Sequence, residues 1–322
     1  DRVNATNNLA YCETIAATNP CGEQPLPPYG ACLLGSINLA NLVVRPFEPG
    51  AALDIERLEA LTEIAIRFLD DVIDVSKFPL PAQQREAVAK RRLGLGVTGL
   101  ANALTMCGVR YGSPEAAALA GRWTSHLKRA AYAASAELAR EKGPFPLFDR
   151  DAFLARPNVA SLDADIRRRI GEHGIRNGLL TSIAPTGTIS LFANNVSSGI
   201  EPVFDHRYVR KVLSADGSRR EEVVEDAAHR LFRARFGGDR VLPPAFVTAA
   251  ELTPSEHVAM QAAVQPHIDS AISKTINCPA DISFEDFQSV YLDAYRRGLK
   301  GCTTYRPNAV TGSVLSALPP AG

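Results

Sequence analysis

The stretch Asn19-Pro20-Cys21-Gly22-Glu23 constrains this chain more than any other. Pro20 lacks a backbone donor and Gly22 lacks a Cβ, so neither residue belongs in the interior of a helix. In an extended segment alternate side chains point to the same side, so Asn19, Cys21 and Glu23 are expected to face one way from a rigid loop. A thiol beside a carboxylate and an amide donor can perform chemistry on a polar ligand. The alternative interpretation is a plain turn that carries a buried cysteine, which is a common place for that residue.

The composition is typical of a soluble globular protein with balanced charge. The chain has 322 residues, enough for one or two domains, and 46% of them are hydrophobic. Lys and Arg together number 35, as do Asp and Glu, so no excess charge indicates a nucleic-acid or membrane surface. No apolar run approaches the length of a membrane span, and no signal peptide is evident. We therefore expect a cytoplasmic protein that binds neither nucleic acid nor membranes.

The six cysteines are scattered along the chain, at Cys12, Cys21, Cys32, Cys107, Cys278 and Cys302. They show neither a CxxC pair nor the spacing of metal ligands, so we expect no metal site. Cys32 follows Cys21 by eleven residues, a separation that suits two thiols brought to one pocket by adjacent segments. Taken alone, Cys32 is better explained as a small core residue. Because the chain begins with Asp1 and not Met, we expect a fragment, a processed product or a shortened form of a longer protein.

Apolar residues at spacings of three and four predict two strong helices. The first covers residues 54–77 and is capped by Asp54, and the second covers residues 114–142, with Pro114 at its start and Gly143 beyond its end. The expected buried stripe of the first helix is Leu58, Leu61, Ala65, Phe68, Val72 and Val75. The other predicted elements are a charged helix near residues 163–172, a hairpin and helix within residues 206–250, and a helix from Ser283 to about Arg297.

Short apolar runs alternate with the helices, and this alternation predicts an α/β architecture. One run ends at Ala184 and another covers residues 299–305, whereas residues 307–322 are expected to form a flexible tail. The glycines of residues 94–99 match a dinucleotide-binding fingerprint, but a charged helical stretch precedes them where that motif needs a strand. Close backbone packing is the favoured use of these glycines, and a Rossmann oxidoreductase is the alternative.

The second informative stretch is Ala184-Pro185-Thr186-Gly187-Thr188-Ile189-Ser190. Here an apolar run ends, the chain turns, and a helix is expected to open at about Ile189. Backbone amides near Gly187, with the hydroxyls of the two threonines and the serine, form a candidate oxyanion cradle. A plain hydroxyl-rich turn is the alternative. The polar loop at residues 194–202 is expected to line the same pocket.

Together these stretches resemble the large catalytic subunit of ribonucleotide reductases, and most closely the adenosylcobalamin-dependent class II type. The likeness rests on NPCGEQPL at residues 19–26, CLLGSINL at 32–39, GLGVTGL at 94–100, APTGTIS at 184–190, SGIEP at 198–202, KTIN at 274–277 and GLKGCTTYR at 298–306. These blocks follow the family's order and span nearly the whole chain. The resemblance implies that residues 1–306 are the carboxy-terminal half of a ten-stranded α/β barrel, with a finger loop at about residues 19–32.

The resemblance implies reduction of ribonucleotides to 2′-deoxyribonucleotides, the precursors for DNA replication, through a thiyl radical. By the family pattern Cys21 carries the thiyl and abstracts the ribose 3′-hydrogen, Glu23 takes the 3′-hydroxyl proton, and Asn19 hydrogen-bonds the substrate hydroxyls. Cys32 supplies reducing equivalents with a second thiol, and the loop of residues 184–190 holds the phosphates. The implied cofactor is adenosylcobalamin, which carries the radical chemistry.

The implied partners are a ribonucleoside di- or triphosphate, a thioredoxin-like reductant, the amino-terminal half of the reductase and a second copy in a homodimer of the full enzyme. The thiol partner of Cys32, the effector region and a carboxy-terminal Cys pair are missing from this sequence, so we expect the isolated chain to be inactive. Two alternatives stay open. One is a non-catalytic phosphate-binding or assembly module of the same fold, and the other is a reductase whose radical comes from a separate metal-bearing subunit.

Overall fold

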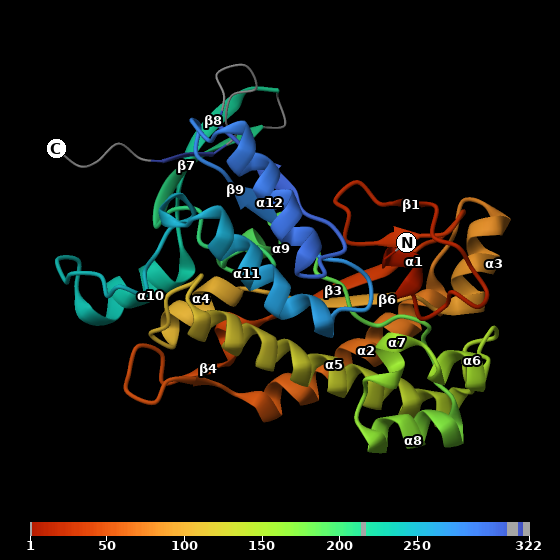
Figure 1. Ribbon diagram of the computed structural model, residues 1–322. Helices are drawn as coiled ribbons and strands as arrows, with labels where there is room; N and C mark the ends of the chain where they lie inside the picture. The colour runs from red at the N-terminus through yellow and green to blue at the C-terminus, as the bar shows by residue number, and fades with distance from the viewer. Residues whose placement is uncertain (1, 214–216, 308–314, 318–322) are drawn as a thin grey trace.

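The computed structural model describes residues 2–213, 217–307 and 315–317 (Figure 1). Its centre is a row of parallel extended segments. Strand β3 (Leu33–Asn38) pairs in parallel with β6 (Leu93–Thr98). On the other side of β6, residues 179–183 continue the row through a parallel bridge between Leu95 and Thr181.

Two further segments extend this row. Ile183 bridges Ile272 in parallel, and the chain from there runs into β9 (Thr275–Asn277), which pairs in parallel with β10 (Thr303–Tyr305). The order is therefore β3, β6, residues 179–183, residues 270–277 and β10. This parallel arrangement, with helices between the strands in sequence, confirms the predicted α/β class. Among the described residues the row ends at β3 on one side and at β10 on the other.

Glycines allow the segments of this row to approach closely. Every residue of β6 is buried, and a Cβ placed on Gly96 would lie 2.2 Å from the carbonyl oxygen of Ser182. A Cβ on Gly94 would lie 2.5 Å from Nε2 of Gln24. The prediction of close packing is confirmed. The Rossmann interpretation fails, because Gly94 and Gly96 lie inside a strand that follows α3 (Pro81–Lys90), and not in a turn after a strand.

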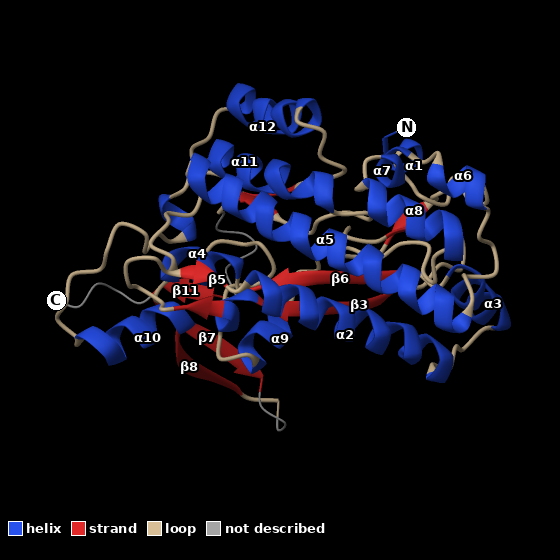
Figure 2. Ribbon diagram, turned by 90° about the horizontal axis from the view of Figure 1, so that it is seen from below, coloured by secondary structure: helices blue, strands red, loops and turns tan. Residues whose placement is uncertain are grey.

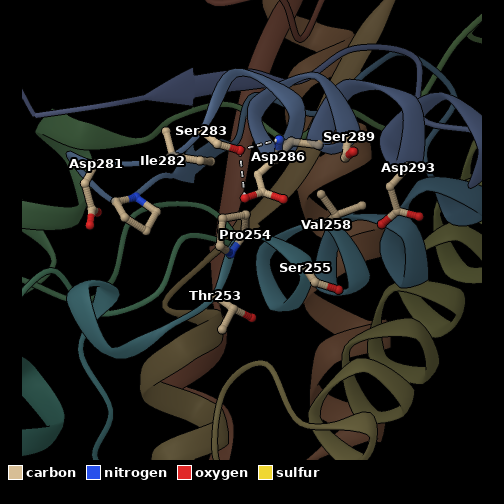
Figure 3. Close-up of a pocket in the computed structure, with 12 residues that line it drawn as sticks. Thr253, Pro254, Ser255, Val258, Asp281, Ile282, Ser283, Asp286, Ser289 and Asp293 are labelled. Carbon is tan, nitrogen blue, oxygen red and sulfur yellow. Dashed lines mark hydrogen bonds between the residues drawn. The ribbon is translucent and has the colours of Figure 1, made fainter.

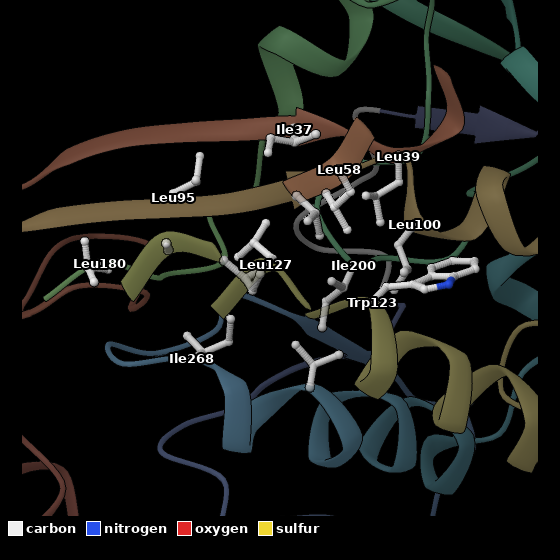
Figure 4. Packing of buried hydrophobic residues seen from close by; sticks show 14 of the residues in the cluster. Ile37, Leu39, Leu58, Leu95, Leu100, Trp123, Leu127, Leu180, Ile200 and Ile268 are labelled. Atoms are coloured by element: carbon white, nitrogen blue, oxygen red, sulfur yellow. The ribbon is translucent and has the colours of Figure 1, made fainter. Parts of the chain in front are cut away.

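The two strong helices form where the sequence places them. Helix α2 (Ile55–Val75) begins after Asp54, whose carboxylate accepts the Arg57 N–H at 3.0 Å. Helix α5 (Pro114–Lys142) begins after Ser113 and ends before Gly143. Both run alongside β3 and β6 (Figure 2). Figure 4 shows their side chains in the shared core, where each fully buried leucine contributes on the order of 2 kcal/mol.

The predicted buried stripe of α2 was wrong at two positions. Phe68 is 64% exposed and Val75 is 76% exposed. The face that packs on the core instead carries Leu58, Thr62, Ile66, Leu69, Asp70 and Ile73. The helix has two interleaved sets of apolar residues, and the set that is buried includes a carboxylate. That carboxylate is satisfied, because Asp70 accepts from Nε of Arg91 at 2.7 Å and from the Asn177 amide at 2.9 Å.

The carboxy-terminal third supplies helices at the end of the row. The predicted hairpin forms as β7 (Arg207–Leu213) and β8 (Arg219–Glu225), followed by α10 (Ala227–Phe236). Helix α11 (Pro254–Val264) and helix α12 (Phe284–Arg296) follow. Within the expected tail, β11 (Leu315–Ala317) pairs with β7. Residues 308–314 and 318–322 of that tail lie outside the described residues.

The remaining elements are short. They are α1 (Arg2–Ala5), β1 (Ala17–Thr18), β2 (Pro25–Leu26), β4 (Val43–Val44), β5 (Ala52–Leu53), α4 (Leu100–Met106), α6 (Arg150–Leu154), α7 (Pro157–Ala160), α8 (Ala164–His173) and α9 (Gly187–Phe192). None of the helices in the described part of the chain is both long enough and apolar enough to cross a bilayer.

Candidate functional site

The stretch around Cys21 is the tip of a small hairpin. Strands β1 and β2 pair antiparallel and enclose residues 19–24. The N–H of Asn19 donates to the Gln24 carbonyl at 3.1 Å, and Oδ1 of Asn19 accepts the Gln24 N–H at 3.1 Å. The N–H of Gly22 donates back to the Asn19 carbonyl, and Gly22 has φ +80°, a conformation that favours glycine. The predicted rigid loop is therefore present.

The loop is not the extended segment from which the sequence expected Asn19, Cys21 and Glu23 to face one side. Residues 19–22 form a turn, so the alternation of an extended strand does not apply to them. Cys21 is exposed, whereas Glu23 is only 2% exposed. The predicted alternative, a turn with a buried Cys21, is also wrong. The thiol is exposed at the loop, and the carboxylate two residues later is buried.

Glu23 holds an unusual carboxylate. Its Oε2 is buried and has no hydrogen-bond partner among the described residues. A buried acceptor without a donor costs about 1–3 kcal/mol, and more when it is charged. Such groups are uncommon in folded proteins and tend to mark sites where a missing donor is supplied by a ligand or water.

The hairpin is anchored on the row of parallel segments through its backbone. The carbonyl of Glu23 accepts from the Ser182 hydroxyl at 2.9 Å and from the Ala271 N–H at 2.9 Å. The side chain of Gln24 accepts from the Ser270 hydroxyl at 3.3 Å and lies against Gly94. These contacts place the thiol loop over the third and fourth segments of the row.

Cys32 lies immediately before β3 and is half-buried. Burial raises the pKa of the Cys32 thiol to about 12, the Arg92 guanidinium opposes this rise, and the Glu23 carboxylate adds to it. Cys32 and Glu23 are thus close enough to interact electrostatically. At neutral pH this pKa keeps the Cys32 thiol protonated, and a protonated thiol is a poor nucleophile.

The stretch at residues 184–190 borders a cavity of about 580 Å³. Helix α9 begins at Gly187, two residues earlier than predicted, and its first-turn N–H groups have no intrahelical acceptor. Gly187, Thr188 and Ser190 line the cavity. Ala184, Pro185, Thr186 and Ile189 are not among the described residues that line it.

One predicted hydroxyl of the cradle has a structural use instead. Oγ1 of Thr186 pairs with Oγ1 of Thr98 at 2.9 Å and accepts the Gly199 N–H at 2.7 Å. The Ser190 hydroxyl contacts Oγ of Ser198 at 3.0 Å at the cavity wall. The loop of residues 194–202 does line the same cavity, as predicted, through residues that include Asn195.

The hairpin and the cavity use the same two segments of the row. Ser182 contacts the hairpin, and Gly187, five positions further along the chain, is the first residue of the loop that lines the cavity. An extended chain of that length reaches at most about 18 Å. None of Asn19, Cys21, Glu23 and Cys32 is among the described residues that line the cavity. The arrangement is an exposed thiol loop and a cavity that use the same third and fourth segments of the row.

Sequence reasoning expected the loop that carries Glu201 to line this cavity, but it gave no site role to Thr275 or Lys274. Glu201 and Thr275 lie there, and Glu201 Oε2 pairs with Nζ of the buried Lys274 at 2.8 Å. Both members of this pair belong to sequence blocks that carry the family likeness, SGIEP and KTIN. That membership was the available signal, but 73 positions separate the two residues.

A second cavity, of about 600 Å³, lies between α11 and α12 (Figure 3). Three of its lining residues are Asp281, Asp286 and Asp293, and no lysine or arginine is among its described lining residues. The Ser283 hydroxyl that faces it is used in capping α12, because it accepts the Asp286 N–H at 3.0 Å. The cavity beside residues 184–190 is also lined by three carboxylates, those of Glu201, Asp205 and Asp226, but Arg210 lines it as well. The cavity between α11 and α12, without a described basic lining residue, is therefore the less favourable one for a phosphorylated ligand.

Among the described residues, the acidic side chains of Asp70, Asp71 and Asp74 of α2 lie close enough together to hold a metal ion. Arg91 contacts both Asp70 and Asp74 at 2.7 Å, and Lys142 contacts Asp71. Because cations already engage these oxygens, this group is a salt-bridge cluster.

The comparisons with known proteins agree with this geometry. Residues 1–305 match the family model of the ribonucleotide reductase barrel domain, so the chain belongs to that family. It is 40% identical over 342 aligned positions to the vitamin B12-dependent ribonucleoside-diphosphate reductase of Mycobacterium tuberculosis strain H37Rv, covering 99% of this chain and 44% of the relative. The resemblance drawn from the sequence blocks is confirmed.

Other relatives carry similar names. The vitamin B12-dependent ribonucleoside-diphosphate reductase of Thermoplasma acidophilum is 36% identical, over 98% of this chain and 41% of its own length. The vitamin B12-dependent ribonucleotide reductase of Streptomyces coelicolor is 29% identical, over 98% of this chain and 38% of its own length. The chain thus spans less than half the length of these relatives.

Proposed function

We propose that this chain supplies the reactive thiol and the substrate-phosphate loop of an adenosylcobalamin-dependent ribonucleotide reductase. The observation that carries the proposal is Oε2 of Glu23, a buried acceptor without a donor, in the same tight loop as the exposed Cys21. A ribose hydroxyl that enters between the loop and the cavity would supply the missing donor.

Each residue then has a defined role. Cys21, as a thiyl, removes the 3′-hydrogen, and Glu23 Oε2 accepts the 3′-hydroxyl proton. Oδ1 of Asn19 is occupied by the Gln24 N–H, so its amide NH₂ group donates to a substrate hydroxyl. The 2′-hydroxyl leaves as water, and two thiols supply two electrons and two protons and become one disulfide. Cys32 is one of these thiols, and the other comes from outside this chain. Cys21 then returns the hydrogen atom to C3′, which regenerates its thiyl.

The phosphate groups occupy the cavity at the start of α9. Backbone N–H groups of the first turn and the hydroxyls of Thr188 and Ser190 are the donors there. A diphosphate and a triphosphate would use the same donors.

The exposed position of Cys21 fits the cofactor, because the radical must reach this sulfur from a molecule that can approach it from outside the chain. When bound, adenosylcobalamin supplies that radical. A thioredoxin-like reductant restores the thiols. Free thiols that cycle in this way suit a reducing compartment such as the cytoplasm.

We further propose that the row of five parallel segments is one half of a ten-stranded barrel. The amino-terminal half would pair at β3 and β10, cover the exposed hairpin tip and bring the second thiol. The relatives are more than twice as long as the aligned region, which leaves sufficient chain for that half. A homodimer of the full enzyme is part of the same proposal.

The test is deoxyribonucleotide formation from a mixed ribonucleotide pool with adenosylcobalamin and a dithiol. The chain is assayed alone and together with the amino-terminal region of a relative. Product is expected only from the mixture, and the Cys21→Ser variant should abolish it while nucleotide binding, measured by equilibrium dialysis, is retained. Turnover by the isolated chain would refute the need for a second half. Nucleotide binding without product in the mixture would favour a non-catalytic module or a reductase with a separate radical-generating subunit.

A further inference from the structure

Lys274 is a fully buried cation directly behind the wall of the phosphate cavity. It is 2% exposed, and its ammonium group has three acceptors. Nζ donates to Oε2 of Glu201 at 2.8 Å, to the Thr275 carbonyl at 3.0 Å and to Nδ1 of His257 at 2.9 Å. An ammonium group has three donors, so this set satisfies it completely.

The partner of Lys274 faces the cavity. Glu201 lines it together with Gly187, Thr188 and Ser190, and its Oε1 accepts the Thr275 N–H at 2.5 Å. The carboxylate is thus held between the loop of residues 198–202 and strand β9. An unpaired carboxylate at this place would repel any phosphate in the cavity.

Burial lowers the pKa of the Lys274 ammonium group, and the charge and hydrogen bond of Glu201 oppose this shift and favour the charged form. His257 is fully buried on α11, and burial, with the charge of Lys274, lowers its pKa to about 3. The Tyr111 ring lies 5.8 Å from Nζ, and its hydroxyl donates to the Ile200 carbonyl at 2.5 Å. The ring therefore supports both the cation and the loop that carries Glu201.

We propose that Lys274 is a positioning residue that neutralises Glu201 and so permits a polyphosphate to bind in the cavity. The inference rests on the proposed role of residues 184–190 as the phosphate loop. Lys274 does not touch the ligand, because its side chain is buried behind Glu201. It acts by fixing the carboxylate and cancelling its charge.

The experiment uses the full-length enzyme and the variants Lys274→Met, Glu201→Gln and the double variant. Equilibrium dialysis gives the Kd for a nucleoside, its monophosphate and its diphosphate. Lys274→Met should weaken diphosphate binding by about tenfold or more, and nucleoside binding by much less. The double variant should recover most of the lost diphosphate affinity, because the repelling charge is gone.

Lys128→Met is the matched control. Lys128 is also buried, but it bonds Asn158 at 2.6 Å, and it is not among the described lining residues of the cavity. This control should lower the melting temperature without a selective effect on phosphorylated ligands. If Lys274→Met folds poorly, Glu201→Gln alone decides. It should leave diphosphate binding as tight or tighter, whereas a purely structural pair would make it weaker.

The outcomes separate the inference from the proposed function. If the wild-type enzyme binds nucleoside and diphosphate equally, the phosphate loop itself is refuted. If the wild type prefers the diphosphate but Lys274→Met weakens both ligands alike, or the double variant shows no recovery, the neutralising role is refuted and the proposed function stands.

Discussion

At the scale of single residues, two buried carboxylates of the same region differ in their partners. Glu23 has one buried oxygen without a donor, whereas both oxygens of Glu13 contact Arg92 at 2.7 Å. A paired buried charge stabilises the fold only as long as its partner remains. An unpaired one costs stability and is retained for what it can bind.

We therefore expect opposite results from Glu23→Gln and Glu13→Gln. Glu23→Gln should reduce the rate of deoxyribonucleotide formation by the complete enzyme about 10²- to 10⁴-fold, because the general base is lost. Its free energy of unfolding should stay the same or rise. Glu13→Gln should lower that free energy by about 3–5 kcal/mol, because it leaves the Arg92 charge unpaired. Rate assays and urea unfolding measure the two effects, and a strongly destabilised Glu23→Gln would contradict this account.

Residue types revealed the thiol loop from the sequence, but not the directions of its side chains. The order Asn19, Cys21, Glu23 predicted a tight loop with a reactive thiol. The loop is present, and the reactivity of the thiol stays a prediction. The hydrogen bonds between Asn19 and Gln24 close a turn, in which the thiol is exposed and the carboxylate two residues later is buried. The ion pair of Lys274 with Glu201 was out of reach, because long-range pairs depend on how the strands align and not on local spacing.

At the scale of elements, the sequence predicted the start of α2 more reliably than it predicted which face of α2 is buried. Asp54 is the N-cap of α2, as predicted, because an N-cap depends only on residues that are close to it in the sequence. The buried face of α2 depends on what packs against it. Two apolar sets compete along this helix, and the chosen set includes Thr62 and Asp70, which pattern counting assigns to solvent.

The choice of face predicts the cost of two substitutions on α2. Ile66 is fully buried, so Ile66→Ala should lower the free energy of unfolding by about 2–5 kcal/mol. Phe68→Ala removes a larger side chain but should change it by less than about 0.5 kcal/mol, since the ring is mostly exposed. Urea unfolding of both variants gives the comparison. If Phe68→Ala lowered the free energy of unfolding more than Ile66→Ala, the buried face expected from the sequence would be the correct one.

At the scale of the whole molecule, buried polar groups tie the row of strands to the helices. The Asp269 carboxylate accepts from the Tyr132 hydroxyl of α5 at 2.8 Å and from the Leu180 N–H at 2.9 Å. Lys300, just before β10, donates to the Asp269 carbonyl at 2.6 Å. Burial lowers the pKa of Lys300 to about 8, the Asp269 carboxylate opposes this shift, and the charge of Lys128 adds to it.

This shift predicts a pH-dependent contribution to stability. Between pH 8 and 10.5 the unfolded chain holds the Lys300 proton more tightly than the folded chain does, so this residue's contribution to stability rises with pH. Below pH 8 the penalty of the buried charge is present in full. Relative to Lys300→Met, the wild type should therefore gain unfolding free energy across this range, by on the order of 1–3 kcal/mol. Parallel curves for the two proteins in urea unfolding at pH 7 to 10.5 would contradict the shift.

The glycines of β6 also limit how this protein can be altered. The smallest possible side chain at Gly94 would already overlap the amide of Gln24, and one at Gly96 would overlap the backbone at Ser182. Substitutions at Gly94 or Gly96 therefore cannot change the distance between the Cys21 sulfur and the strands in small steps. A redesign that needs a larger substrate space has to change the hairpin itself, because Gly94 and Gly96 beneath it already lack side chains that could be shortened.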